Sequence, residues 1–277
     1  MINDNVLAIH DICSFSKSSL TVVIPIMETL GIEVSPLPTA ILSTQTDGYK
    51  NIYFKDLYDS LNEIFQHLKN ENCSFSSVYS GFLSNYKQVK QVKKICQYYK
   101  EKDESLIIID PVLGDNNEMY KNINNEHVEA MRDLVSIADY ITPNMTEVAL
   151  LLGIKFQKNY SIDKIKEILI NLSKLGSKNS IITSIKLNKN NENIFNASID
   201  SNKNINFYSS SRVDIHYPGT GDLFTSLLAS KLIKGNELNE SIIFATGIIY
   251  DTIKASVDNK RQEKLGISTI EAIKLLK

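Results

Sequence analysis

Hydrophobic and polar positions along this chain follow two different periods, one typical of buried strands and the other typical of amphipathic helices. Short apolar runs predict buried strands at residues 6–9 and 106–109. Further strands are predicted at residues 33–37, 75–79, 140–142 and 180–184. Apolar residues at spacings of three and four predict helices at residues 18–30, 55–69, 86–100, 125–137, 144–152, 163–175, 221–233, 238–255 and 269–276. We expect Pro36 and Pro38 to end the second strand.

Strands and helices follow one another in turn along most of the chain. This alternation is typical of right-handed β–α–β units, in which parallel strands lie side by side with helices on both faces. Two later segments, residues 193–199 and 205–209, flank a polar turn and predict a paired β-ribbon. Because no linker, low-complexity stretch or internal repeat interrupts the sequence, we expect one domain over residues 1–277.

The composition excludes several classes of function. Hydrophobic residues make up 43% of the chain and charged residues 22%, which is ordinary for a globular protein with a substantial core. A net charge of −2 creates no field that would attract nucleic acid, and no apolar run approaches the length of a membrane span. The three cysteines show no metal-ligand spacing, and the N-terminus lacks a signal-peptide pattern. We therefore expect a cytoplasmic protein with neither nucleic acid nor a membrane as a partner.

The residues Gly219-Thr220-Gly221-Asp222 stand where a loop is expected to enter a helix. Glycines at such a junction let backbone N–H groups turn toward one point, and the following helix adds the positive end of its dipole. Such a site can stabilise the charge that develops on a phosphoryl group during transfer, and Asp222 can accept the proton of an attacking hydroxyl. The same residues also suit a plain turn with Asp222 as the N-cap, so the tetrapeptide alone leaves both interpretations open.

Four further motifs precede this segment in a fixed order along the chain. They are Leu42-Ser43-x-x-Thr46 with Gly48-Tyr49, Ser80-Gly81-Phe82-Leu83, Asp110-Pro111-Val112-Leu113-Gly114-Asp115 and Thr142-Pro143-Asn144-x-x-Glu147. Together with Gly-Thr-Gly-Asp they resemble the motifs of the ribokinase-like superfamily, and more closely those of its pyridoxal/pyridoxamine kinase and hydroxymethylpyrimidine kinase branch. The resemblance extends over nearly the whole chain, and residues 18–21 and 36–39 look most like those of pyridoxamine kinases.

This resemblance implies a fold and an activity. The implied fold is the ribokinase-like three-layer α/β/α arrangement with a mostly parallel central sheet. The implied activity is the ATP-dependent phosphorylation of the 5′-hydroxymethyl group of pyridoxal, pyridoxamine or pyridoxine in vitamin B6 salvage, with Mg²⁺ as the cofactor. The resemblance further implies a homodimer, and it leaves a requirement for K⁺ open.

The resemblance also implies roles for the residues of the reaction centre. The expected general base is Asp222, and the expected anion hole consists of Gly219, Thr220 and Gly221. An aspartate at a helix N-terminus should remain ionised near pH 7, so positioning must provide much of the catalysis. The residues expected to contact the vitamin are Asp11, Thr46, Phe82 and Asp222. Phe82 suits core packing at a strand end equally well.

A second group of residues is implied to bind ATP and magnesium. The expected ATP-binding residues outside the anion hole are Asp110, Asp115, Asn144, Glu147, Thr183 and Ser184. Of these, Asn144, Glu147 and Asp110 are expected to organise Mg²⁺, mostly through water. Asn144 and Glu147 also have the spacing of a helix capping box, and both roles can hold at once.

Two alternatives to a B6 kinase remain open. A hydroxymethylpyrimidine kinase of thiamine biosynthesis shares every catalytic motif, and Asp11 stands where many pyridoxal kinases have a serine. The residues at positions 14–17 also depart from the glycines that relatives often carry there, which leaves the effect on activity open. A vitamin-binding protein with weak catalysis is the other alternative, although the intact Gly219, Gly221 and Asp222 argue against it.

Overall fold

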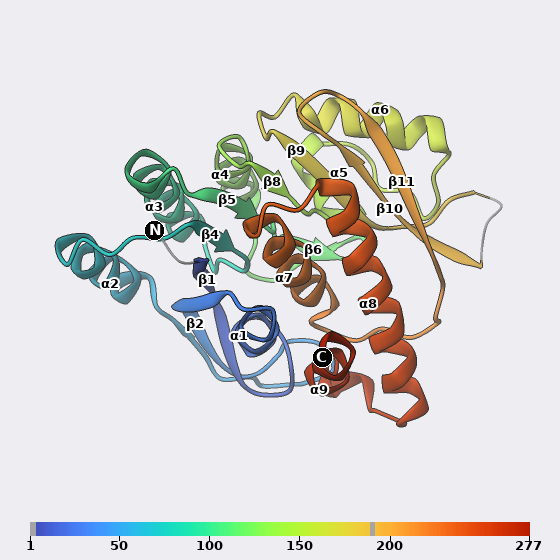
Figure 1. Cartoon of the computed structure of the whole chain (residues 1–277), viewed down its shortest axis with the longest axis horizontal. Helices are drawn as coiled ribbons and strands as arrows, with labels where there is room; N and C mark the ends of the chain where they lie inside the picture. Colours follow the sequence, from blue (N-terminus) through green and yellow to red (C-terminus); the bar gives the residue numbers. More distant parts are fainter. Residues whose placement is uncertain (1–3, 189–191) are drawn as a thin grey trace.

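The computed structural model describes residues 4–188 and 192–277, and a nine-stranded sheet runs through this part of the chain (Figure 1). Its strands are β1 (Asn5–Phe15), β2 (Glu33–Thr44), β3 (Phe54–Asp56), β4 (Ser77–Ser80), β5 (Leu106–Ile109), β8 (Tyr140–Ile141), β9 (Asn179–Ile185), β10 (Asn193–Ile199) and β11 (Ile205–Ser211). The spatial order is β11-β10-β9-β8-β5-β4-β1-β2-β3. Neighbours from β2 to β9 are parallel, whereas β3 and the β10–β11 ribbon pair antiparallel at the two edges.

Helices cover both faces of this sheet. One layer consists of α1 (Leu20–Thr29), α7 (Thr220–Ile233), α8 (Leu238–Asp258) and α9 (Thr269–Leu276), which contact one another. The other layer consists of α2 (Tyr58–Asn70), α3 (Tyr86–Asp103), α4 (Asn125–Val135), α5 (Met145–Leu152) and α6 (Ile162–Ser173), packed in chain order. A short hairpin of β6 (Gly114–Asp115) and β7 (Glu118–Met119) and a 3₁₀ turn (Glu263–Leu265) complete the described elements. The predicted three-layer α/β/α fold with a mostly parallel sheet is confirmed.

The central strands are buried on both faces, which explains their unbroken apolar sequences. Ile107 and Ile109 of β5 pack into the core beneath α3 to α6. Ile108 points the other way and packs with Ala229 of α7. All of these isoleucines have no exposed surface, so a strand at this position needs apolar side chains at every residue.

The prediction that Pro36 and Pro38 end the second strand is wrong, because β2 continues to Thr44. Glu33 donates its backbone N–H to the carbonyl of Asp4, directly before β1, so the N–H positions of the alternate residues 34, 36 and 38 face away from that strand. On their side β3 pairs only with residues 40–42. The missing proline N–H groups therefore cost no ladder hydrogen bond.

Short segments account for the remaining differences from the predicted elements. The helix predicted from residue 55 begins at Tyr58, because residues 54–56 pair with β2 as the edge strand β3. The two-residue strands β6 and β7 were also not predicted. Segments of two or three residues contain too few positions to show a period, so only their tertiary pairing reveals them.

The chain changes direction across the sheet at β1. From β1 it moves outward to β2 and β3 on one side, and it then returns to β4 on the other side. Ligands of open α/β sheets bind at such a switch point, beyond the carboxyl ends of the strands. No helix of the described residues is long and apolar enough to cross a lipid bilayer.

Candidate active site

The segment before α7 places the start of this helix at the carboxyl edge of the sheet. Gly219 is the N-cap and adopts a left-handed conformation with φ +83°. A Cβ at this position would lie 2.8 Å from the carbonyl oxygen of Lys17, so only glycine fits without a shift. The N–H groups of the first helical turn lack intrahelical acceptors, and those of Gly221 and Asp222 belong to this turn.

Two other segments meet the start of α7. Lys17 donates its backbone N–H to the carbonyl of Leu265 at 3.0 Å, and Ile267 donates its own to the carbonyl of Pro218 at 2.8 Å. Ser16 and Ser19 in the first of these segments have positive φ angles of 72° and 54°. The loop over residues 14–17 thus keeps a glycine-like conformation at Ser16 without a glycine.

Asp222 lies in the first turn of α7, but its carboxylate does not cap this helix. Its Oδ1 lies 3.0 Å from Nε2 of His10, and its Oδ2 accepts the backbone N–H of Ser19 at 2.6 Å. The interpretation of Asp222 as a simple N-cap is therefore wrong. Burial would raise the pKa of Asp222, but the hydrogen bond and charge of His10 and the N–H of Ser19 keep this pKa below its ordinary value. The carboxylate is ionised near pH 7, as we expected.

His10 connects this carboxylate to a second one. Its Nδ1 lies 2.8 Å from Oδ1 of Asp11, and the side chains of His10, Asp11 and Asp222 are 3%, 7% and 12% exposed. Burial alone would lower the pKa of His10, but the hydrogen bonds and charges of the two aspartates raise it to about 10. The imidazole is therefore a buried cation near pH 7, and Asp222 is the member of the three that solvent reaches most.

A second acidic group lies beside this one. Burial, followed by the charge of Asp222, raises the pKa of Asp110 to about 7. Burial and the charge of Asp110 raise the pKa of Glu147 well above its ordinary value. Asp110 follows β5, and the side chain of Glu147 approaches it from α5. Three carboxylates with mutually unfavourable charges thus converge at this edge of the sheet, and such a group favours a bound cation.

Asn144 and Glu147 form the capping box that their spacing suggested. The Asn144 side chain accepts the N–H of Glu147 at 3.0 Å, and Glu147 Oε2 accepts the N–H of Asn144 at 2.8 Å. The other Glu147 oxygen accepts the N–H of Leu113 at 3.3 Å. Asp115 accepts the N–H of Asn116 within the β6–β7 hairpin. The ATP and metal roles of these residues stay predictions.

The donor set suits a hydrated cation better than a dry cage. Within residues 4–188 and 192–277, no three or more His, Cys, Asp and Glu side chains gather closely enough to hold a metal ion by themselves. Both oxygens of Glu147 already accept backbone N–H groups. Because Mg²⁺ usually keeps several of its waters, the buried and repelled carboxyls of Asp110 and Glu147 fit an ion bound mostly through water.

Thr183 and Ser184 lie near the end of β9, beside this group. The N–H of Thr183 donates to the carbonyl of Pro143 at 3.0 Å, and Thr183 forms a parallel bridge with Asn144. Ser184 is exposed, has a positive φ of 58°, and donates its N–H to Asn196 at 3.1 Å. Their position at the carboxyl edge agrees with a role in ATP binding, which stays a prediction.

Besides Asp222, three residues are predicted to contact the vitamin, and they lie in different surroundings. Phe82 follows β4, is partly buried, and directs its backbone N–H at His10. Asp11 is buried and bound to the same histidine. Thr46 is exposed in the loop after β2, where the neighbouring Gln45 side chain binds the carbonyl of Lys264. Asp11 and Phe82 are thus brought close to Asp222 through His10, while Thr46 is linked to the site only through its loop.

The sequence reasoning assigned no role to several residues of this site. His10, Ser19 and Gly81 are the ones that matter most, because they contact Asp222 or the residues that hold it. A histidine directly before Asp11, at the end of an apolar strand, was the available signal for the first of them. Ser19 acts through its backbone, and nothing in its side chain indicates this role.

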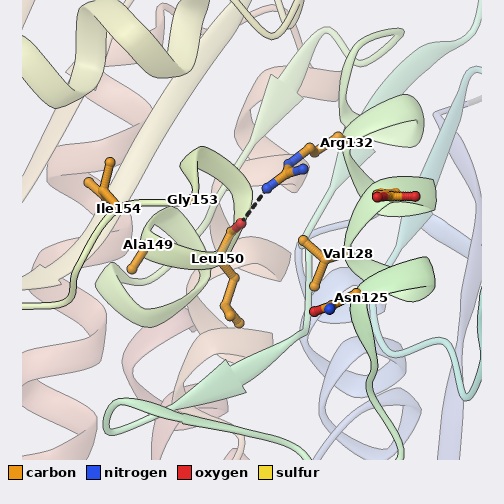
Figure 2. Close-up of a pocket in the computed structure, with 8 residues that line it drawn as sticks. Asn125, Val128, Arg132, Ala149, Leu150, Gly153 and Ile154 are labelled. Atoms are coloured by element: carbon orange, nitrogen blue, oxygen red, sulfur yellow. Dashed lines mark hydrogen bonds between the residues drawn. The ribbon is translucent and has the colours of Figure 1, made fainter.

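A pocket elsewhere on the molecule has a structural explanation. Figure 2 shows this cavity of about 360 Å³ between α4 and α5, with Arg132 beside it. The guanidinium of Arg132 donates to the carbonyls of Leu150 and Leu151 at 3.0 and 2.7 Å. These carbonyls belong to the last turn of α5, so Arg132 satisfies a helix C-terminus. None of the predicted site residues lines this pocket.

An ionised carboxylate beside a helix N-terminus can accept the proton of an attacking hydroxyl group while the helix start stabilises the charge on a transferred phosphoryl group. Combined with the three-layer fold, it defines a small-molecule kinase of the ribokinase-like class. The family model for phosphomethylpyrimidine kinase matches residues 25–265, and the chain belongs to this family.

Relatives in this family include named pyridoxal kinases. The pyridoxal kinase of Dictyostelium discoideum is 32% identical over 249 residues, which cover 85% of this chain and 80% of the relative. A Bacteroides thetaiotaomicron protein assigned to the phosphomethylpyrimidine kinases, solved in a crystal form with pyridoxal, is 33% identical with a TM-score of 0.94. The match covers 99% of this chain and 96% of that protein. The pyridoxal kinase of Lactobacillus plantarum, 26% identical, has a TM-score of 0.89 over 99% of this chain and 96% of that one.

Substitution of Gly219 by alanine tests the shape of the helix start. Gly219→Ala should lower the turnover number about 10²-fold, because the new Cβ displaces the segment at Lys17 and with it the first turn of α7. Gly235→Ala is the matched control, because Gly235 also has a positive φ of 78° but no atom within 4 Å of an added Cβ. Both variants should lose about 1–2 kcal/mol of unfolding free energy from backbone strain.

Steady-state kinetics and urea unfolding of both variants provide the measurement. Equal turnover in Gly219→Ala and Gly235→Ala would show that the close approach of Lys17 has no bearing on catalysis.

Proposed function

We propose that this kinase transfers the γ-phosphoryl group of ATP to the 5′-hydroxymethyl group of pyridoxal, pyridoxamine or pyridoxine. The observation that carries the proposal is the position of Asp222, held by His10 and Ser19 in the first turn of α7. The similar Bacteroides structure with pyridoxal and the Dictyostelium pyridoxal kinase support the choice of vitamin.

In the proposed reaction Asp222 is the general base. The O–H bond of the hydroxymethyl group breaks and its proton passes to Asp222, while the oxygen forms a new bond to the γ-phosphorus. The bond between this phosphorus and the oxygen of the leaving ADP breaks. The backbone N–H groups of Gly219 and Gly221 are proposed to face the charge on the transferred group. The third predicted donor, the N–H of Thr220, instead donates to the carbonyl of Tyr217 at 3.3 Å. Because the pKa of Asp222 is low, its proton affinity is small and its placement is the larger contribution.

We propose that Mg²⁺ is bound mostly through water beside Asp110, Asn144 and Glu147. When bound, this ion neutralises charge on the ATP phosphates. The protein contributes the buried carboxyls of Asp110 and Glu147, whose pKa values are raised. A cation bound nearby would favour their ionised forms. The proposed contacts to the phosphates come from Asp115, Thr183 and Ser184.

The vitamin is proposed to lie between the loop that carries Thr46 and the residues after β4. Phe82 is partly buried there and can pack on an aromatic ring. Asp11 is also proposed to contact the vitamin, and its carboxylate binds His10 in the structure. We further propose that residues 1–277 form one domain and that the enzyme is a cytoplasmic homodimer. A requirement for K⁺ is tested by assays with and without this ion.

Hydroxymethylpyrimidine is the second candidate substrate. The matching family model is that of phosphomethylpyrimidine kinase, and Asp11 stands where the resemblance to pyridoxal kinases would favour serine. Both substrates present a hydroxymethyl group on a flat nitrogen heterocycle, so the catalytic residues cannot distinguish them. A catalytically weak binding protein is a less favoured candidate, because the catalytic segment is intact.

An ATP-consumption assay with four substrates separates these candidates. Pyridoxal, pyridoxamine, pyridoxine and hydroxymethylpyrimidine are each tested at equal concentration with Mg-ATP. We expect the highest kcat/KM with one of the three B6 compounds. A higher kcat/KM with hydroxymethylpyrimidine would assign the enzyme to thiamine biosynthesis. Binding of pyridoxal without ADP release would indicate a binding protein.

The general base is tested by Asp222→Asn. This variant should bind ATP and the vitamin almost as the wild type does, but its turnover number should fall about 10²- to 10⁴-fold because the proton acceptor is lost. Asp251→Asn, at an exposed position of α8, is the control for the substitution itself. Calorimetry measures binding and an ADP-release assay measures turnover. Near-normal turnover in Asp222→Asn would exclude the assigned base.

The magnesium site is tested by Glu147→Gln. The variant should need a higher Mg²⁺ concentration for half-maximal rate, because one of the carboxyls that favour a cation becomes neutral. Glu167→Gln, at an exposed position of α6, is the control. Thermal unfolding checks that the capping box of α5 persists in Glu147→Gln. A magnesium titration identical to that of the wild type would remove Glu147 from the metal site.

A further inference from the structure

His10 occupies a position in which each ring nitrogen meets a carboxylate. Nε2 lies 3.0 Å from Oδ1 of Asp222, and Nδ1 lies 2.8 Å from Oδ1 of Asp11. The two aspartates come from different parts of the fold, since Asp11 lies in β1 and Asp222 lies 212 residues later than His10. The imidazole therefore links the central strand of the switch point to the helix that carries the proposed base.

The surroundings of the ring are built to its shape. A Cβ on Gly81 would lie 2.0 Å from Cδ2 and Nε2 of His10, so any side chain there would displace the imidazole. The ring of Tyr79 meets His10 edge-on, with 6.2 Å between ring centroids. His10 itself is 2% exposed. Gly81 thus has a specific function, which is to leave room for the imidazole at the end of β4.

The hydrogen bonds of His10 define where its protons lie. Asp222 is ionised, so the contact at 3.0 Å requires a proton on Nε2. The contact of 2.8 Å between Nδ1 and Asp11 also requires a proton, because two bare acceptors would repel at that distance. The backbone N–H groups of Asp11 and Phe82 also lie close to Nδ1, at 3.0 and 3.2 Å. The Nε2–H donates to Asp222.

We propose that His10 is a positioning residue, which holds the Asp222 carboxylate away from the N-terminus of its own helix. The inference rests on the proposed role of Asp222 as the base. An acidic side chain in the first turn of a helix tends to bind the free N–H groups of that turn. Here the Nε2–H of His10 binds Oδ1 and the N–H of Ser19 binds Oδ2, so Asp222 does not occupy the first-turn N–H groups of Gly221 and Asp222. The N–H of Thr220 donates to the carbonyl of Tyr217 at 3.3 Å.

Without His10 the base would lose one of its two anchors. The carboxylate of Asp222 could then turn toward the start of α7. There it would occupy the anion hole and lie too far from the substrate hydroxyl to accept its proton. Asp11 serves the same arrangement indirectly, because its contact with Nδ1 orients the ring whose Nε2–H faces Asp222. Each oxygen of Asp222 retains a second lone pair, which is free to accept the proton of the substrate.

Two substitutions of His10 separate its hydrogen bond from its volume. The side-chain amide of His10→Gln reaches the position of Nε2 and can still donate to Asp222, whereas that of His10→Asn reaches only the position of Nδ1. The turnover number should fall within about tenfold for His10→Gln but about 10²-fold for His10→Asn, with little change of KM for either substrate. Equal turnover of the two variants, or an unchanged turnover in both, would overturn the proposal.

His127 provides the matched control. It is a buried histidine of α4, 1% exposed, and neither ring nitrogen has a hydrogen-bond partner. His127→Gln and His127→Asn should leave the turnover number per folded molecule unchanged, even where they lower the unfolding free energy. Urea unfolding of all four variants gives the folded fraction, and each measured turnover number is divided by this fraction.

A spectroscopic measurement tests the placement directly. In protein with ¹⁵N-labelled histidine at pH 8, the Nε2 of His10 should carry a proton, and its shift should change in Asp222→Asn. An unprotonated Nε2 would contradict the proposal. If Asp222→Asn keeps its turnover, the proposed base is wrong whatever His10 does. If Asp222→Asn loses turnover but both His10 variants keep it, only the role of His10 fails.

Discussion

A hydrogen-bonded cation between two carboxylates holds this active site in one arrangement. Asp222 would be a costly group at the edge of a buried site if it were alone, and Asp110 beside it adds to the repulsion. The imidazolium of His10 offsets part of this negative charge and keeps Asp222 ionised. The same carboxylate also joins α1 to α7, because Ser19 at the start of α1 binds its other oxygen.

Much of the fold could be predicted from sequence because its strands and helices bury complete faces. The apolar run of β5 and the ribbon of β10 and β11 appear within two residues of the predicted limits. The prolines of β2 misled the prediction, because their effect depends on which neighbour the missing N–H would have met. That information lies in the sheet order and not in the local sequence.

The site was predictable where side chains form motifs and unpredictable where geometry joins distant segments. The spacing of Gly219 and Asp222 indicated a loop that enters a helix, and the spacing of Asn144 and Glu147 indicated their capping box. The bond from His10 to Asp222 spans 212 residues, and no local period or motif reports such a pair. Backbone donors such as the N–H of Ser19 leave no signature in residue type at all.

The same long separation has a consequence for the synthesis of the enzyme. A ribosome that adds about 5–20 residues per second finishes β1 some 10–40 s before it reaches α7. During this time the nascent chain has its central strand but lacks the helix start, and the segment at Leu265 that contacts Lys17 comes later still. An incomplete chain therefore lacks the proposed base and the segment that contacts Lys17, and under the proposed function activity begins only after Leu265 has been added.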